Sequence, residues 1–297
     1  MVRPLPAGLP LRHFLLALAV VAVWGSNFVV IKLALGHLSP MLFAALRFTF
    51  ALIPAMFFLP LPKVGRKNLA CYGLLIGVGQ FGMLYLAIDG HIAPGIASLV
   101  VQTQVFFTIG LSMRMNGERV QVFQWCALAL ATAGIAIIGL HTDGTTTFLG
   151  LALVLFAALC WAGGNVASKV GAPSNMLAYV VWASVFAVPP LFVLAVLMEG
   201  APATLQQLRD ADAMTWAAVT WQSWGNTLFG YAAWGWLLAR YPAATITPMA
   251  LLVPVFGMSA SAWWLGESLP VWKLLAAALV MGGLAVNLLW PRLRQRF

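Results

Sequence analysis

The sequence predicts an all-α integral membrane protein with ten transmembrane helices, arranged as two inverted repeats of five helices each. Three observations support this fold class. Hydrophobic residues make up 62% of the 297-residue chain and charged residues only 8%, far below the roughly 25% that a soluble domain uses to cover its surface. Ten continuous apolar stretches can be recognised, each close to the ~20 residues that a helix needs to cross a bilayer. Related short motifs occur in both halves of the chain.

The apolar stretches occupy most of the chain and leave no room for a soluble domain. They are continuous, and they are about twice as long as the ten-residue alternating segments of a membrane β-barrel, which favours helices. The first stretch is longer than the apolar core of a signal peptide, and no convincing cleavage site follows it, so we interpret it as the first span. The predicted spans are 14–34, 40–59, 69–89, 93–113, 121–140, 148–168, 176–198, 214–238, 242–265 and 270–290.

Basic residues divide unevenly between the two sides of such a ten-span chain, which predicts its orientation. Because Lys and Arg gather on the cytoplasmic side of membrane proteins, both termini are predicted to be cytoplasmic. We interpret the formal net charge of +9 as this topological signal and not as a nucleic-acid-binding surface. The predicted outer side carries Lys32, Arg209, Lys273 and most of the acidic residues. The predicted cytoplasmic side carries Arg3, Arg12, Lys63, Arg66, Lys67, Arg114, Arg119, Lys169, Arg240, Arg292, Arg294 and Arg296.

Two pairs of related motifs divide the chain into a first repeat, residues 1–141, and a second repeat, residues 142–297. The stretches VWGSNFVVIK and WAGGNVASK place Trp161 137 positions after Trp24. In APGIASLVVQTQVFF…NGERV and YPAATITPMALLVPVF…LGESL, the first prolines are 148 positions apart and the Gly-Glu pairs 149. Because each repeat holds an odd number of spans, the second must cross the membrane in the opposite sense. Such inverted repeats are typical of secondary transporters that bind substrate near the membrane midplane.

These motifs, with LRF at Leu46–Phe48, GER, MALLVPVFG and GES, resemble the EamA-type family of the drug/metabolite transporter superfamily. The resemblance covers essentially the whole chain, and it is strongest to the bacterial inner-membrane exporters of O-acetylserine and cysteine. It implies a ten-span fold with cytoplasmic termini and export of small amino-acid-related metabolites by alternating access. A drug exporter, or a transporter of another metabolite from the same superfamily, is the alternative that the sequence leaves open.

Arg47 is the leading candidate for substrate binding, because it is the one basic residue clearly inside a predicted span. A charge within the bilayer is costly and is functional by default, although the side chain could also snorkel to the outer surface. Its forked guanidinium is suited to a carboxylate. No acidic residue in the predicted spans is an obvious partner for it, which leaves room for an anionic group of the substrate.

Amide and indole side chains supply further candidates. Asn27 and Asn165, its counterpart in the second half, either hydrogen-bond between helices or line a cavity, because an unpaired amide in hydrocarbon is unfavourable. Trp24 and Trp161 lie several residues inside their spans, away from the usual position of an aromatic belt. They therefore either pack in the core or line the same cavity.

The fourth predicted span contains two glutamines, of which we expect one to face the cavity. Gln102 and Gln104 would point about 200° apart on an α-helix, and we favour Gln104. The predicted substrate-binding residues are Trp24, Asn27, Arg47, Gln80, Gln104, Trp161 and Asn165.

The sequence predicts neither an enzyme nor a cofactor or metal site. The three cysteines fall within or at the edge of predicted spans, and the four histidines lie near span ends. The chain contains no GxxxxGK[ST] motif, so it is not expected to use ATP directly. The predicted partners are a small-molecule substrate and the lipid bilayer. Protons are a candidate coupling ion, although no carboxylate is predicted at the middle of a span.

Overall fold

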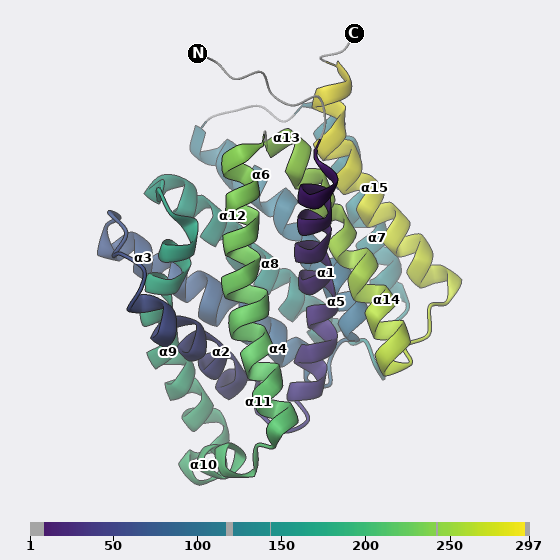
Figure 1. Ribbon diagram of the computed structural model, residues 1–297. Coiled ribbons are helices and arrows are strands. Elements are labelled where there is room, and N and C mark those ends of the chain that lie inside the picture. Colours follow the sequence, from purple (N-terminus) through teal and green to yellow (C-terminus); the bar gives the residue numbers. More distant parts are fainter. Residues whose placement is uncertain (1–8, 117–120, 143, 242, 295–297) are drawn as a thin grey trace.

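The computed structural model describes residues 9–116, 121–142, 144–241 and 243–294, and within those ranges the chain is helical without strands (Figure 1). The first half contains α1 Leu11–Ala34, α2 Pro40–Met56, α3 Arg66–Gly73, η1 Leu74–Gly82, α4 Met83–Ile88, α5 Pro94–Val100, η2 Val101–Thr103, α6 Gln104–Asn116 and α7 Val122–Leu140. The second half contains α8 Phe148–Gly171, α9 Met176–Glu199, α10 Ala201–Asp210, α11 Ala213–Thr220, η3 Trp221–Phe229, α12 Gly230–Arg240, α13 Ala243–Ile246, η4 Thr247–Leu252, α14 Val253–Leu265 and α15 Val271–Arg294.

Eight helices in the described part of the chain are long and apolar enough to cross a membrane. They coincide with eight of the predicted spans and support a membrane protein. The helices at the other two predicted spans, 40–59 and 214–238, are not among these eight, for separate reasons. The helix α2 has 17 residues and ends earlier than predicted, at Met56. The run from α11 to α12 carries Gln, Ser, Asn and Thr side chains in its middle, which lower its hydropathy.

Two helical runs contain π-helical segments that the sequence analysis did not predict. The segments η1 and η3 are each nine residues long, and every residue of η3 lies 147 positions after its counterpart in η1. Tighter 3-10 segments also occur in both halves, as η2 and η4, the second beginning at Thr247 and Pro248. Deviations of this kind inside helices often mark functional sites.

Helices from the two halves pack against one another in pairs, including α7 with α15, α2 with α9 and α1 with α14. Glycines allow the closest approaches. A Cβ atom added at Gly283 of α15 would lie 2.5 Å from the carbonyl oxygen of Ala127 in α7, and one at Gly134 would meet Val280. Because small residues at a helix interface let the backbones approach in a membrane, these contacts hold α7 and α15 together along their length.

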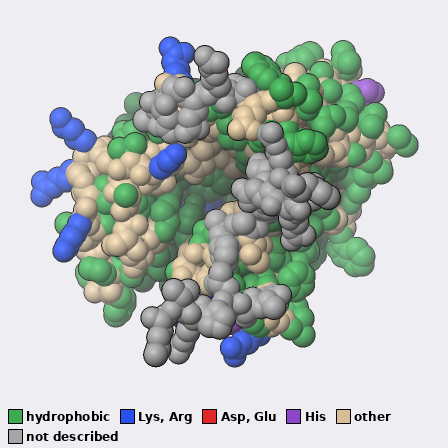
Figure 2. All heavy atoms as spheres, turned by 90° about the horizontal axis from the view of Figure 1, so that it is seen from above, with side chains coloured by type: hydrophobic (Ala, Val, Ile, Leu, Met, Phe, Trp, Pro, Cys, Tyr) green, Lys and Arg blue, Asp and Glu red, His purple; other side chains and the backbone are tan. Residues whose placement is uncertain are grey.

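The start of α1 and the end of α15 lie at the same end of the molecule (Figure 1). Seen from that end, the molecule is hollowed near its middle, with Lys and Arg side chains at the edge and no described Asp or Glu side chain in view (Figure 2). Arg3, Glu118, Arg119, Asp143, Pro242 and Arg296, which entered the predicted topology and the matching of the repeats, lie outside the described residues.

Candidate functional site

A cavity of about 470 Å³ lies among the helices and is lined by residues from both halves. Ten α-helices contribute to its wall, namely α1, α2, α3, α4, α6, α8, α9, α12, α14 and α15, together with the four irregular segments η1 to η4. All seven residues predicted to bind substrate line this one cavity: Trp24, Asn27, Arg47, Gln80, Gln104, Trp161 and Asn165. The structure therefore brings the predicted set together, and their contact with a substrate stays a prediction.

Arg47 reaches the cavity from α2 with its side chain almost fully buried. Its 1% exposure excludes snorkelling to the outer surface. The Nη1 and Nη2 atoms donate to the Tyr85 hydroxyl at 2.9 Å and to Thr227 Oγ1 at 3.1 Å. The guanidinium carbon lies 3.6 Å from the centre of the Phe81 ring, which is a favourable cation–π distance. All these partners are neutral, and no described residue that lines the cavity is acidic.

A chain of neutral hydrogen bonds extends from Arg47 across the bundle. The Tyr85 hydroxyl donates to Gln222 Oε1 at 3.1 Å, and Asn226 Nδ2 donates to the same oxygen at 3.4 Å. The indole of Trp24 donates to the Asn226 carbonyl oxygen at 3.2 Å. This network links α1, α2, α4 and η3. This network was not predicted, although the polar run WQSWGNT inside the eighth predicted span was a signal for it.

The four predicted amides fall into two groups. Asn165 Nδ2 donates to Gln104 Oε1 at 2.9 Å and to Thr108 Oγ1 at 3.2 Å, so this amide both bonds between α8 and α6 and lines the cavity. Asn27 and Gln80 are each 3% exposed. Their side-chain oxygens, Asn27 Oδ1 and Gln80 Oε1, are buried, and neither has a hydrogen-bond partner among the described residues.

The expectation that only one of the two neighbouring glutamines faces the cavity is wrong. Both Gln102 and Gln104 line it. The prediction assumed a regular α-helix, whereas residues 101–103 form the 3-10 segment η2, which changes the angle between the two side chains. Gln102 Nε2 is also directed toward the Ala250 carbonyl oxygen of η4, at 3.5 Å.

Aromatic side chains form much of the remaining wall. Trp24 lies with its ring centre 5.2 Å from that of Trp234 and 6.1 Å from that of Tyr231. Trp161 and Tyr72 also line the cavity. The two predicted tryptophans therefore lie at the cavity and not in an aromatic belt, and Trp24 additionally packs against its aromatic neighbours.

Helices α1, α5 and α14 pack closely against one another. A Cβ atom added at Gly257 would lie 2.4 Å from Ser98 Oγ. Beyond α14, Glu267 Oε1 accepts a hydrogen bond from the backbone N–H of Gly95 at 3.3 Å. Burial raises the pKa of the Glu267 carboxyl, while the Gly95 N–H and the charge of Lys273 act in the opposite direction. The loop after α14 is thus attached to the start of α5.

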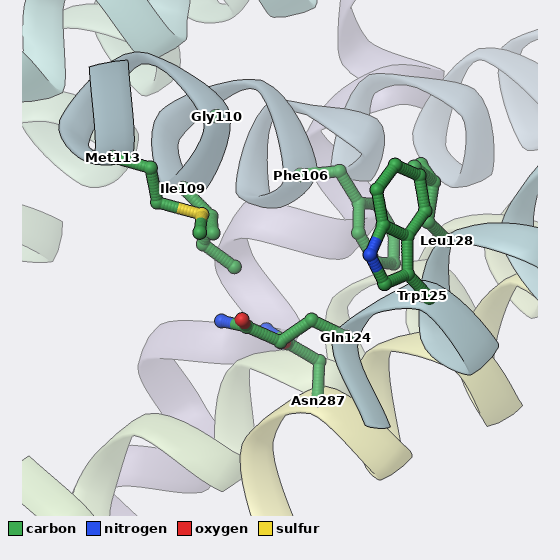
Figure 3. A pocket seen from close by; sticks show the side chains of 8 residues that line it. All are labelled: Phe106, Ile109, Gly110, Met113, Gln124, Trp125, Leu128 and Asn287. Carbon is green, nitrogen blue, oxygen red and sulfur yellow. The ribbon is translucent and has the colours of Figure 1, made fainter. Parts of the chain in front are cut away.

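A smaller pocket of about 80 Å³ lies beside the main cavity. Figure 3 shows Ile109 and Met113 of α6 on one side, with Gln124 of α7 and Asn287 of α15 facing them. Asn287 lines both spaces and so lies in the wall between them. In the described ranges, no group of three or more His, Cys, Asp or Glu residues could hold a metal ion.

Comparison with known families agrees with this architecture. The sequence profile of the EamA-like transporter family matches residues 11–140 and 148–289, which is most of the chain. The chain belongs to the EamA-like transporter family. With its long apolar helices, it is a multi-pass membrane protein whose partners are a small-molecule substrate and the lipid bilayer.

Two curated relatives illustrate the range of the family. A protein of Salmonella typhimurium named probable amino-acid metabolite efflux pump is 40% identical over 286 residues, covering 94% of this chain and 96% of the relative. A protein of Escherichia coli K12 named uncharacterized inner membrane transporter YedA is 27% identical over 281 residues, covering 92% and 89%. A solved crystal structure with 19% identity superposes with a TM-score of 0.62, covering 95% of this chain and 98% of the other, and therefore supports the fold alone.

Proposed function

We propose that this protein is an inner-membrane secondary transporter that exports small amino-acid-related metabolites, such as O-acetylserine or cysteine, by alternating access. The observation that carries the proposal is a buried arginine, Arg47, in the wall of a cavity whose described lining has no acidic residue. The name of the Salmonella relative, probable amino-acid metabolite efflux pump, supports the same substrate class.

Arg47 would bind the carboxylate of the substrate. Its Nε atom is buried and has no partner among the described residues, and its two terminal nitrogens bond only to hydroxyl oxygens. A carboxylate is a stronger acceptor than a hydroxyl for a guanidinium, and it accepts two parallel hydrogen bonds. An anionic group entering the cavity would therefore complete the hydrogen bonding of Arg47 and offset its charge.

We further propose that residues 1–141 and 142–297 are inverted five-span repeats, giving ten spans with both termini in the cytoplasm. The matching π segments η1 and η3, separated by a constant 147 positions, support this organisation. The two matched stretches of the family profile support it as well. Because helices of opposite halves line a common cavity, rocking one half against the other would alternate its opening between the two sides.

A drug exporter is the alternative function, since the aromatic wall would suit flat or cationic molecules. The charge of Arg47 argues against cations, because no described carboxylate in the lining would offset them. Competition separates the two functions: unlabelled cysteine should displace labelled O-acetylserine, and a cationic drug should not.

The transport test is uptake of labelled O-acetylserine or cysteine into inverted membrane vesicles, with and without an imposed pH gradient. We expect accumulation by the wild type and its loss in Arg47→Gln, checked for insertion and folding by the amount of monodisperse protein recovered. Stimulation by the gradient would support proton coupling. Absence of uptake by folded wild-type protein would contradict the proposed substrate class.

A further inference from the structure

We infer that the side chains of Asn27 and Gln80 form a subsite for the ammonium group of the substrate, next to the carboxylate site at Arg47. This inference rests on the proposed function and deepens it. It predicts that the cavity selects molecules that keep a free amino group beside their carboxylate, and that it discriminates against N-acylated forms.

The side-chain oxygens of the two amides are available, because no described residue donates a hydrogen bond to them. The oxygens Asn27 Oδ1 and Gln80 Oε1 are buried without a hydrogen-bond partner in the described chain, and both residues line the cavity. A buried acceptor left unpaired is unfavourable. Since no donor among the described residues fixes either side-chain oxygen, rotation about the last side-chain bond can turn that oxygen toward a bound molecule.

An ammonium group matches what these amides offer. It has three N–H donors and no acceptor, so it must meet oxygen atoms or aromatic faces when it leaves water. None of the described lining residues has a carboxylate, which leaves neutral oxygens as its acceptors. The rings of Trp24 and Tyr231, which line the same cavity, would add cation–π attraction.

The position of Gln80 fits a group that lies beside a bound carboxylate. The ammonium and carboxylate groups of an α-amino acid are attached to the same carbon atom, so their two subsites must be neighbours. Gln80 and Phe81 of η1 both line the cavity together with Arg47, and the guanidinium carbon of Arg47 lies 3.6 Å from the centre of the Phe81 ring. Asn27 lies on α1, which packs against η3, the segment that contains Thr227, a hydrogen-bond partner of Arg47.

The test compares cysteine with N-acetylcysteine, which keeps the carboxylate and thiol but has no ammonium group. Both compete with labelled O-acetylserine for the purified, detergent-solubilised full chain. We expect the wild type to bind cysteine at least about tenfold more tightly, the loss expected when a hydrogen bond to a charged group is removed. In Gln80→Met, cysteine affinity should fall by about that factor while N-acetylcysteine affinity stays the same.

Two further measurements separate binding from folding. Because Gln80 Oε1 is unpaired in the described chain, Gln80→Met should not lower the unfolding temperature without substrate. The matched control is Asn165→Leu, whose amide already bonds to Gln104 and which should change the affinities for cysteine and N-acetylcysteine by the same factor.

The outcomes distinguish this inference from the proposed function. Wild-type protein that binds neither O-acetylserine nor cysteine overturns both. Equal affinity of the wild type for cysteine and N-acetylcysteine overturns the ammonium subsite alone, and so does an equal loss of both affinities in a stably folded Gln80→Met protein.

Discussion

Asn27 and Asn165 occupy related motifs in the two halves of the chain, but their hydrogen bonding differs. Asn165 donates to Gln104 and Thr108 on α6. The side-chain oxygen of Asn27, Oδ1, has no partner in the described chain. The asparagine of the second half therefore connects two helices at the cavity, whereas the asparagine of the first half has the unpaired oxygen that the proposed ammonium subsite would use.

The difference originates on the neighbouring helical run and not at the asparagines. With the spacing of 148 that separates the prolines of the two motifs, the counterparts of Gln104 and Thr108 are Leu252 and Phe256. Neither side chain has a hydrogen-bonding group, so Asn27 has no partner of the kind that Asn165 has. In the proposed site, a few differences on one helical run would thus be enough to make the two halves bind the substrate differently.

The largest expected effect is the loss of cysteine affinity when Arg47 is replaced, and the effects of replacing either asparagine are compared with it. In Arg47→Gln, affinity for cysteine should fall roughly 100-fold, because hydrogen bonds to a charged group are worth up to about 3 kcal/mol. Arg47→Lys keeps the charge but loses the paired N–H donors of the guanidinium, so its cysteine affinity should lie between those of Arg47→Gln and the wild type. Equilibrium binding to purified protein measures both variants, and a folded Arg47→Gln protein with wild-type affinity would contradict the assignment.

The second expected effect is a difference in the free energy of unfolding, without substrate, between variants of the two asparagines. Asn165→Leu should lower the free energy of unfolding by about 1 kcal/mol, the usual value of an interhelical hydrogen bond in a membrane protein. Asn27→Leu should cost nothing or stabilise, since it removes an unpaired buried oxygen. Thermal unfolding in detergent compares them, and equal losses would remove the distinction between the two halves.

A third substitution, with a smaller expected effect, would make the two halves more alike. Leu252→Gln places an amide at the counterpart of Gln104, where it could donate to Asn27. We expect a gain of about 0.6 kcal/mol in unfolding free energy, together with weaker cysteine binding. The gain should vanish when Leu252→Gln is combined with Asn27→Leu, as a double-mutant cycle would show. A gain that persists in the double variant would mean that Gln at this position acts elsewhere.

The smallest effect concerns the start of a helical run outside the cavity. Asp212 Oδ1 accepts hydrogen bonds from the Thr215 hydroxyl at 2.6 Å and from its backbone N–H at 2.8 Å, and these bonds lower the pKa of that carboxyl. The corresponding residue of the first half, Gly65, has no side-chain cap.

Because the folded-state pKa of Asp212 is depressed, the stabilisation by its carboxylate is complete above the unfolded pKa of about 3.9 and is lost as the pH falls through the lower folded value. Asn also caps helices well. Asp212→Asn should therefore leave the unfolding temperature nearly unchanged at pH 7 and remove a slight loss of stability on acidification. An identical acid dependence in both proteins would show that this cap does not titrate as expected.

Long apolar runs were sufficient to predict the helices, because a segment such as residues 148–168 has no other way to satisfy its backbone in lipid. The burial of Arg47 could also be anticipated from a single charge inside a span. The bonds from Tyr85 to Gln222 and from Asn165 to Gln104 could not, since they join residues 137 and 61 positions apart. The pattern of residues within one segment contains no information on such distant pairs. It also did not indicate the π-helical segments η1 and η3.

The central claim is that the free amide of the first half serves the substrate while the bonded amide of the second half serves the fold. The most direct test is the rise in unfolding temperature caused by saturating cysteine in wild type, Asn27→Leu and Asn165→Leu. We predict that Asn27→Leu loses most of this rise, whereas Asn165→Leu starts from a lower unfolding temperature and retains the larger share of the rise. The reverse order, or an equal loss in both variants, would contradict the claim.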